Sequence, residues 1–178
     1  MSLQWILGLL VLALVVYVVS IYNSLASMRT RIRAAVQEIG NQLKRQAELI
    51  PNLEESVKGY FKHEKDILKM LSDARKLVAA GKDASQQISE VLPKLQVIVE
   101  SNPQLKGADV VSKLMDELRD TADKVMYSRR SLIDLTADYN IKLVTFPSSL
   151  VANAFGFQSE KGFETTEAET RHKRVKLS

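Results

Sequence analysis

The sequence predicts an all-α protein that consists of one N-terminal transmembrane helix followed by a water-soluble helical domain. First, the residues that break helices are sparse, with 7 Gly and 4 Pro in 178 residues, whereas Leu, Val, Ala, Lys and Glu are abundant. Second, all 25 Lys and Arg and all 21 Asp and Glu lie after Tyr22. Third, apolar residues after that point recur in steps of three and four, which is typical of amphipathic helices.

The N-terminal segment has the length and composition of a membrane span. Leu3–Ile21 holds no charged side chain, and the 20 residues from Leu3 to Tyr22 make a helix of about 30 Å, which matches a hydrocarbon core of about 30 Å. A cleaved signal peptide is the alternative, with a small-residue site at Ser24–Ala26. No Lys or Arg precedes the apolar run, and the run exceeds the usual ~7–15 residues, so we expect an uncleaved anchor over 1–22.

The flanking charges predict how this helix is oriented. Three basic residues, Arg29, Arg31 and Arg33, follow the span before any acidic residue, and none precedes it. The positive-inside rule then places the N-terminus outside and the domain in the cytoplasm. Trp5 and Tyr22 lie near the two ends of the span, where aromatic residues anchor helices at the membrane interface.

We expect the membrane helix to continue into the domain, because no Gly or Pro lies between Leu9 and Ile39. The apolar positions after the span follow an eleven-residue repeat, which predicts a nearly straight helix. These positions are Leu25, Met28, Ile32, Val36, Ile39, Leu43, Ala47 and Ile50.

Pro51 interrupts this helical pattern, and a proline within a helix costs roughly 3 kcal/mol. The apolar phase resumes at Leu53, so one kinked helix is possible. A helix unbroken from Tyr22 to Ala80 would be about 88 Å long, whereas a domain of this size has a radius of gyration near 15 Å. We therefore expect a turn or a sharp break at Pro51-Asn52.

The rest of the domain sequence predicts further helices. Ala80–Asp83 predicts a helix end followed by a restart, with Gly81 past the end and Asp83 as N-cap. Residues 84–100 contain Pro93 and predict two pieces or one kinked helix. A long helix is expected over 108–144, with an apolar stripe of Val111, Leu114, Leu118, Ala122, Val125, Leu132, Leu135, Tyr139 and Leu143.

Arg129 falls on that stripe, and we interpret it as a structural residue at the edge of the core, with its stem buried. Phe146-Pro147 ends the long helix, and a short helix is expected over 148–155. From Gln158 the chain is polar without a period. The predicted organisation is therefore an anchor at 1–22, a helical bundle domain at 23–157 and a flexible polar and basic tail at 158–178.

No group of residues in the sequence predicts catalysis, a cofactor or a metal site. His63-Glu64 resembles the start of a zinc-protease helix, but Ile67 stands where the second His is required. His172 lies in the predicted tail, and the chain has no cysteine. We therefore expect that the protein is not an enzyme, with no catalytic, cofactor-binding or metal-binding residue.

The predicted tail carries a basic cluster that could bind anionic lipid head groups or could only aid solubility, and the sequence leaves both open. Few aromatic residues lie among its basic residues, so nucleic-acid binding is not expected. The basic residues of the cluster are Arg171, Lys173, Arg174 and Lys176.

Short motifs in order along the chain resemble the LemA family. That resemblance implies a bacterial single-pass membrane protein whose domain is an antiparallel, up-and-down, bromodomain-like four-helix bundle, with no established activity or cofactor. It also implies a break at Pro51. The chain departs from the family's usual pattern at Ala122 and at Leu132-Ile133. The motifs include Gln42–Arg45, Leu49–Leu53, Val57–Tyr60, Asn102-Pro103, Ser128–Arg130, Asp138–Asn140, Phe146–Ser148, Val151-Ala152 and Gly156-Phe157.

The sequence favours a membrane-anchored interaction or scaffold protein, which acts through binding to a protein partner or to a second copy. The resemblance to the LemA family implies that its membrane is the bacterial inner membrane. One alternative is an accessory subunit of an envelope enzyme or transporter. A second alternative is a small-ligand sensor with a pocket between helices, but a small-molecule ligand is not expected because no polar pocket is marked on the apolar stripes.

Overall fold

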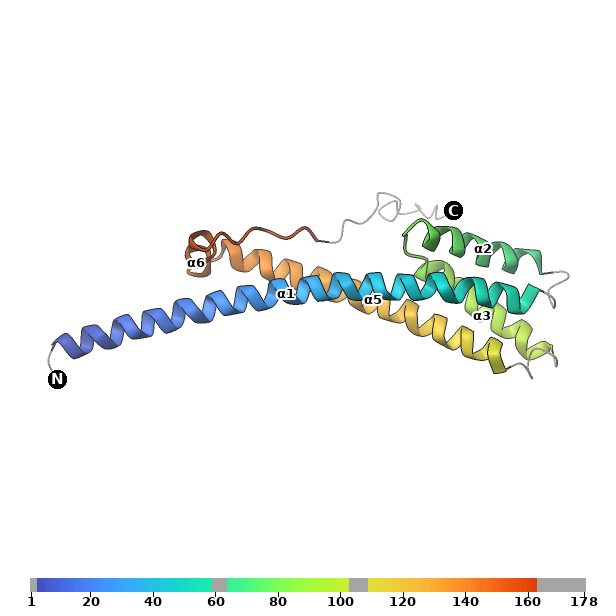
Figure 1. The fold of residues 1–178 in the computed structure, drawn as a ribbon, viewed down its shortest axis with the longest axis horizontal. Helices are drawn as coiled ribbons and strands as arrows, with labels where there is room; N and C mark the ends of the chain where they lie inside the picture. Colours follow the sequence, from blue (N-terminus) through green and yellow to red (C-terminus); the bar gives the residue numbers. More distant parts are fainter. Residues whose placement is uncertain (1–2, 59–63, 103–108, 163–178) are drawn as a thin grey trace, which may run out of the picture. The chain divides into compact units, whose positions relative to one another are not determined.

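A computed structural model describes residues 3–58, 64–102 and 109–162 of the chain (Figure 1). These residues form α-helices and no strand, which confirms the all-α prediction. The chain divides into two compact units: a bundle unit, Ala35–Arg130, and a terminal unit, Met1–Ala34 with Ser131–Ser178. The helices are α1 (Leu3–Lys58), α2 (Lys65–Ala79), α3 (Ser85–Ser101), α5 (Asp109–Val144) and α6 (Ser148–Ala154).

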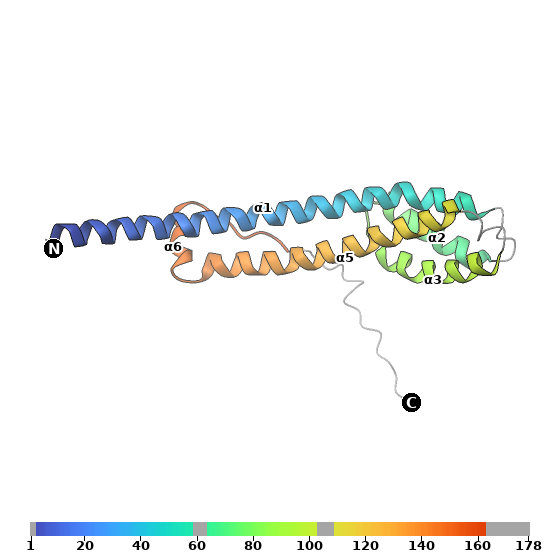
Figure 2. The ribbon, with the colours of Figure 1, turned by 90° about the horizontal axis from the view of Figure 1, so that it is seen from below.

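The bundle unit is an up-and-down arrangement of four helical segments, as expected. Figures 1 and 2 show that the second half of α1, α2, α3 and the first half of α5 run in alternating directions. All four contribute to one apolar core. Its members are Leu49, Ile50, Leu53, Val57, Ile67, Leu71, Ala74, Val78, Ala84, Ile88, Val91, Leu92, Leu95, Val99, Val111, Met115, Leu118 and Ala122.

The turn expected at Pro51 is wrong, because α1 continues through this proline to Lys58. The missing N–H and the ring of a proline cost a helix roughly 3 kcal/mol. Leu53 and Val57, one and two turns further on, are both fully buried. Since burying such a side chain contributes roughly 1.5–3 kcal/mol, these two residues offset the cost of the proline. The next helix, α2, begins at Lys65 and runs in the direction opposite to α1 (Figures 1 and 2).

Five buried residues of α1 recur every seven positions, so burial does not follow the expected eleven-residue repeat. Val36 is 53% exposed, and Ala47 is also exposed. A seven-residue spacing is typical of helices that pack side by side over many turns. The buried positions at this spacing are Leu25, Ile32, Ile39, Gln46 and Leu53.

Gln46 is the polar member of this series, and its side chain is 0% exposed. Neither atom of its amide has a hydrogen-bond partner among the residues that the structure describes. Burying an amide without a partner costs about 1–3 kcal/mol. We therefore expect Gln46→Leu to raise the free energy of unfolding by about 1–3 kcal/mol, measured by urea unfolding of the detergent-solubilised chain and followed by circular dichroism.

The matched control for this variant is Ala47→Leu, at the neighbouring exposed position of the same helix. It places the same side chain on the surface, where we expect a change within about 0.5 kcal/mol. A Gln46→Leu protein that is less stable than the wild type would show that the amide is satisfied in solution.

The turn between α2 and α3 follows the sequence prediction closely. Gly81 has a φ of +68°, which lets the N–H of Gly81 and of Lys82 donate to carbonyls in the last turn of α2. The Asp83 carboxylate accepts a hydrogen bond from the Ser85 N–H at 2.8 Å, although the N-cap residue itself is Ala84. α3 is one helix that contains Pro93, so the two-piece alternative is wrong.

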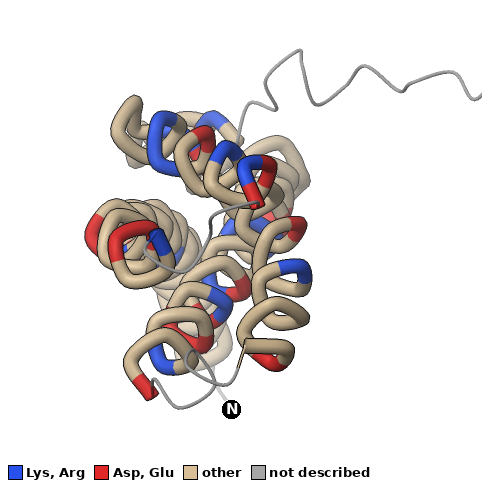
Figure 3. The backbone as a smooth tube through the Cα atoms, turned by 90° about the vertical axis from the view of Figure 1, so that its right-hand side faces the viewer, with Lys and Arg blue, Asp and Glu red and all other residues tan. Residues whose placement is uncertain are grey.

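The long helix expected over 108–144 is confirmed as α5, Asp109–Val144. Arg129 lies at the edge of the core as expected, with its side chain 24% exposed and its Nη1 2.7 Å from Asp83 Oδ2. The expected short helix is α6, and Pro147 immediately precedes it. In the view of Figure 3, both acidic and basic residues occur on the helices that face the viewer.

Candidate functional site

The first part of α1, within the terminal unit, is an apolar helix with no buried residue from Leu3 to Tyr22. Its most apolar 18-residue window has a mean hydropathy of 2.6, and none of that window is buried. Every residue from Leu3 to Tyr17 is exposed, so this segment is not the core helix of a soluble fold. In the part of the chain that the structure describes, α1 is the one helix with the length and composition to cross a membrane.

The predicted interface residues lie at the two ends of this segment. Trp5 is 73% exposed and Tyr22 is 40% exposed. The Tyr22 ring makes edge-to-face contacts with Phe155 and Phe157, at centroid distances of 5.0 Å and 5.5 Å. The three rings therefore form an aromatic cluster where the uncharged part of α1 ends.

Gly156 makes this cluster possible, because it closes α6 and turns the chain back. Its φ is +70°, a conformation that favours glycine. With this turn, the Phe157 N–H donates to Ala152 O at 2.9 Å and the Gly156 N–H donates to Asn153 O at 3.3 Å. The chain then leaves α6 in the direction that brings Phe157 to Tyr22.

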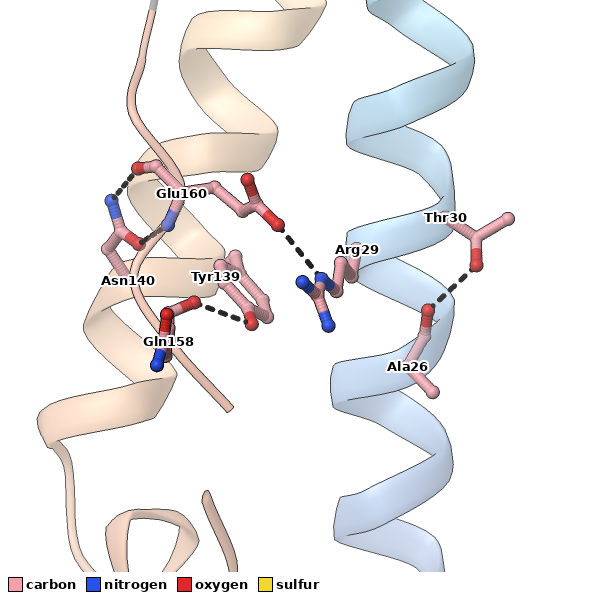
Figure 4. A network of polar contacts seen from close by, with 7 residues as sticks. All are labelled: Ala26, Arg29, Thr30, Tyr139, Asn140, Gln158 and Glu160. Atoms are coloured by element: carbon pink, nitrogen blue, oxygen red, sulfur yellow. Dashed lines mark hydrogen bonds and ion pairs between the residues drawn. The ribbon is translucent and has the colours of Figure 1, made fainter. Parts of the chain in front are cut away.

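Residues 157–160, here called the return segment, are held against α5 by hydrogen bonds (Figure 4). The Tyr139 hydroxyl donates to Gln158 O at 3.0 Å. The Asn140 amide donates to Glu160 O at 2.9 Å and accepts from the Glu160 N–H at 3.1 Å. The first backbone groups of the expected polar tail are therefore hydrogen-bonded to α5, as far as Glu160.

Glu160 also links the return segment to α1. The Arg29 Nε donates to Glu160 Oε1 at 2.9 Å, and the two side chains are 40% and 30% exposed. Lys142 of α5 donates to Ser24 Oγ of α1 at 2.8 Å. Three elements of the terminal unit, namely α1, α5 and the return segment, thus meet around Arg29 and Glu160 (Figure 4).

Tyr139 is the most buried group of this site, with 0% of its surface exposed. Burial raises the pKa of its hydroxyl above the usual 10.0, because the phenolate would lose its hydration. Arg29 and Arg33 oppose this shift, and Glu160 adds to it. At neutral pH the hydroxyl therefore stays protonated and donates a hydrogen bond to Gln158 O.

The structure brings some of the predicted site residues together and leaves others apart. Arg29 and Tyr22 belong to the contacts above, whereas the Arg31 and Arg33 side chains are exposed. Nothing described tests the topology role predicted for the three arginines. Six residues with predicted or weighed roles lie outside the described residues, namely His63, Arg171, His172, Lys173, Arg174 and Lys176.

The bundle unit holds a small hollow between α3 and α5, with a volume of about 180 Å³. Gln96, Val99 and Glu100 line it on α3, and Ser112, Met115 and Asp116 line it on α5. Small-molecule sites are typically ~300–1,000 Å³. This hollow is therefore smaller than a typical small-molecule site.

The sequence reasoning missed Asn140, Gln158 and Glu160 as parts of a site. The one available signal was the adjacent pair Tyr139-Asn140, noted only as part of a family-like motif. Gln158 takes part through its backbone carbonyl, and Glu160 largely through its backbone. Since every residue has these backbone atoms, the residue types gave no sign of the contacts that Gln158 and Glu160 make through them.

A model of the LemA family matches residues 35–178. The match covers the whole bundle unit together with the second half of α5, α6 and the return segment. None of the curated proteins matches the chain.

Proposed function

The chain belongs to the LemA family, and from this premise we propose that it is a membrane-anchored helical scaffold that acts by binding another protein rather than by catalysis. The first part of α1 is its anchor in the bacterial cytoplasmic membrane. The N-terminus faces outward, and the helical domain faces the cytoplasm.

The continuity of α1 is the observation that carries this proposal. The helix runs without interruption from Leu3 to Lys58. Its first part is uncharged and exposed, whereas its later residues Leu53 and Val57 are 0% exposed in the core of the bundle unit. The anchor and a core element of the domain are thus one helix, as a scaffold fixed at a membrane requires.

The charge distribution along α1 supports the proposed orientation. Arg29, Arg31 and Arg33 follow the apolar segment about two to three turns after Tyr22, and no charged side chain precedes it. Such an excess of basic residues is typical of the cytoplasmic side of a membrane helix.

Exposed apolar side chains on the bundle unit support the proposed binding. Tyr127 is 69% exposed and Met126 is 56% exposed, side by side on α5. Aromatic residues and Met are enriched in protein interfaces relative to the rest of the surface. These two residues therefore offer a starting point for a protein contact.

The orientation is tested with single cysteines, since the chain has none of its own. In cells whose outer barrier has been opened, we expect a membrane-impermeant thiol reagent to label Ser2→Cys at once. Ser101→Cys, at the exposed end of α3, should be labelled only after lysis. The reverse pattern would overturn the orientation, and a chain found in the soluble fraction would overturn the anchor.

A second pair of single-cysteine variants tests binding. Tyr127→Cys with a membrane-permeant photo-crosslinker should give one discrete crosslinked product in cells. Asp123→Cys, an exposed polar position one turn earlier on α5, is the matched control and should give far less. Equal, diffuse crosslinking from both positions would contradict a specific contact there.

A further inference from the structure

Large apolar side chains are exposed where α5 passes into α6, all within the terminal unit. We call residues 141–155 the corner. Its exposed apolar residues are more than half exposed, which is unusual for five large side chains so close in sequence. They are Ile141 at 58%, Val144 at 80%, Phe146 at 76%, Leu150 at 62% and Phe155 at 57%.

Charge is nearly absent from this part of the chain. From Tyr139 to Ser159 the one charged residue is Lys142, although charged residues make up 26% of the whole chain. The Lys142 ammonium donates a hydrogen bond to Ser24 on α1. The remaining polar side chains between Ile141 and Phe155 are uncharged hydroxyls and one amide. A water-covered surface of this length normally carries several charges of both signs.

The corner lies beside the end of the apolar segment of α1. Phe155 contacts Tyr22, and Lys142 contacts Ser24, so α5 reaches this level just before it ends. Figures 1 and 2 both show α6 next to the first half of α1. Val18 and Ile21 are the first residues of the apolar segment that are partly covered.

The length of the apolar segment then limits where the membrane boundary can lie. If the boundary came before Val18, only Leu3–Tyr17 of this segment would remain in the hydrocarbon, about 22 Å of helix. A bilayer core is about 30 Å thick. A boundary near Tyr22 gives the required length, and it places the corner at the level of the lipid head groups.

We infer that the corner is a second membrane contact, whose side chains Val144, Phe146 and Leu150 insert at the boundary between lipid head groups and acyl chains. The inference rests on the proposed anchor, because α1 sets the depth of the corner. The Tyr22 ring, which Phe155 and Phe157 contact, and the ammonium of Lys142 suit this layer, where apolar and polar groups meet.

A lipid surface fits the corner better than a second copy of the chain does. The exposed apolar residues of the corner adjoin the exposed apolar segment of α1, so one continuous medium covers both. A short helix that lies at the interface beside a spanning helix needs only one apolar face and no partner of matching shape.

The test measures depth in the full chain, reconstituted into phosphatidylcholine and phosphatidylglycerol vesicles. Single nitroxide labels are placed on Val144→Cys, Phe146→Cys and Leu150→Cys. Collisions with oxygen, which concentrates in lipid, are compared with collisions with a water-soluble nickel chelate. We expect all three corner labels to lose most of their collisions with the chelate and to keep those with oxygen.

Two control labels separate the inference from the anchor. Leu10→Cys, in the middle of the apolar segment, should report lipid, and Ser131→Cys, exposed on α5, should report water. If Leu10 reports lipid and the corner labels report water, the second contact is overturned and the anchor stands. If Leu10 also reports water, the anchor itself is overturned.

The same samples distinguish contact of the corner with protein from contact with lipid. A label covered by a second copy or by another protein loses collisions with both reagents, and this result would overturn the lipid contact. A second copy would in addition broaden the spectra of neighbouring labels. Dilution with unlabelled chain would remove that broadening, whereas burial in lipid would leave the spectra unchanged.

Discussion

Tyr139→Ala is expected to lower the stability of the terminal unit by about 3–5 kcal/mol, the usual cost of truncating a buried aromatic side chain. Tyr139 is 0% exposed and is among the largest fully buried side chains of the described residues. Its loss leaves a cavity beneath the return segment and removes the hydrogen bond to Gln158 O. Hydrogen exchange over residues 132–143 of α5 measures the effect, because faster exchange reports the loss of local stability.

Tyr139→Phe is the matched control, since it keeps the ring and removes only the hydroxyl. We expect it to cost about 1 kcal/mol, the net contribution of one hydrogen bond. The wild type and the Tyr139→Phe variant should also differ in their stability at alkaline pH. Burial raises the pKa of the Tyr139 hydroxyl in the folded state above 10.0. The stability that this protonated hydroxyl contributes is therefore complete below pH 10.0 and is lost as the pH rises through the folded pKa.

The phenylalanine variant has no such group, so its stability should fall less in that alkaline range. If Tyr139→Ala and Tyr139→Phe accelerate exchange equally, the packing of the ring contributes nothing, and the described burial of Tyr139 would be contradicted.

Leu53→Ala is expected to destabilise the bundle unit by about 2–5 kcal/mol, the range for a buried leucine. Leu53 is 0% exposed and lies two residues after Pro51, in the part of α1 that the sequence did not assign to the same helix. The value depends on how far Ile50 and Val57 can close the resulting cavity. Urea unfolding of the detergent-solubilised chain, followed by circular dichroism, gives the change.

The adjacent exposed residue provides the control for this variant. Asn52→Ala changes no buried surface, and on an unbroken helix it should stay within about 0.5 kcal/mol of the wild type. Were Asn52 the capping residue of a turn, the same change would cost about 1 kcal/mol. A marked loss in Asn52→Ala would therefore speak for a break at Pro51 in solution.

The elements with strong local signals could be predicted from the sequence. The long helix that became α5 follows from its apolar stripe, and the turn at Gly81 follows from the residue's freedom at positive φ. Arg129 at the edge of the core was predicted from its place on the stripe. In these cases neighbouring residues alone determine the outcome.

The continuation of α1 through Pro51 and the burial of Gln46 could not be predicted in this way, because tertiary packing determines both. At Pro51 the local cost of proline is offset by burial further along α1, which the sequence pattern does not weigh. At Gln46 a polar residue occupies a buried position. Because the sequence pattern counted only apolar residues, it assigned the buried face of α1 to Ala47 in place of Gln46. That shift produced the incorrect eleven-residue repeat.

The return segment was missed for another reason. Its sequence is polar and has no period, which favours disorder by composition. It is nevertheless ordered through Asn140, whose amide pairs with both backbone groups of Glu160. The Asn140 side chain thus pairs with the backbone of the return segment as a neighbouring strand would. Such a long-range contact cannot be predicted from the sequence of the segment itself.

The extent of α1 decides where a soluble fragment of this protein can begin. The family match starts at residue 35, and a fragment cut there keeps every residue of the bundle unit. It loses Ser24 and Arg29, the partners of Lys142 and Glu160, so the second half of α5 and the return segment are left incomplete. A fragment that begins at Tyr22 keeps these partners and discards the most apolar turns. For crystallisation or solution spectroscopy of the whole domain, the cut belongs before Tyr22.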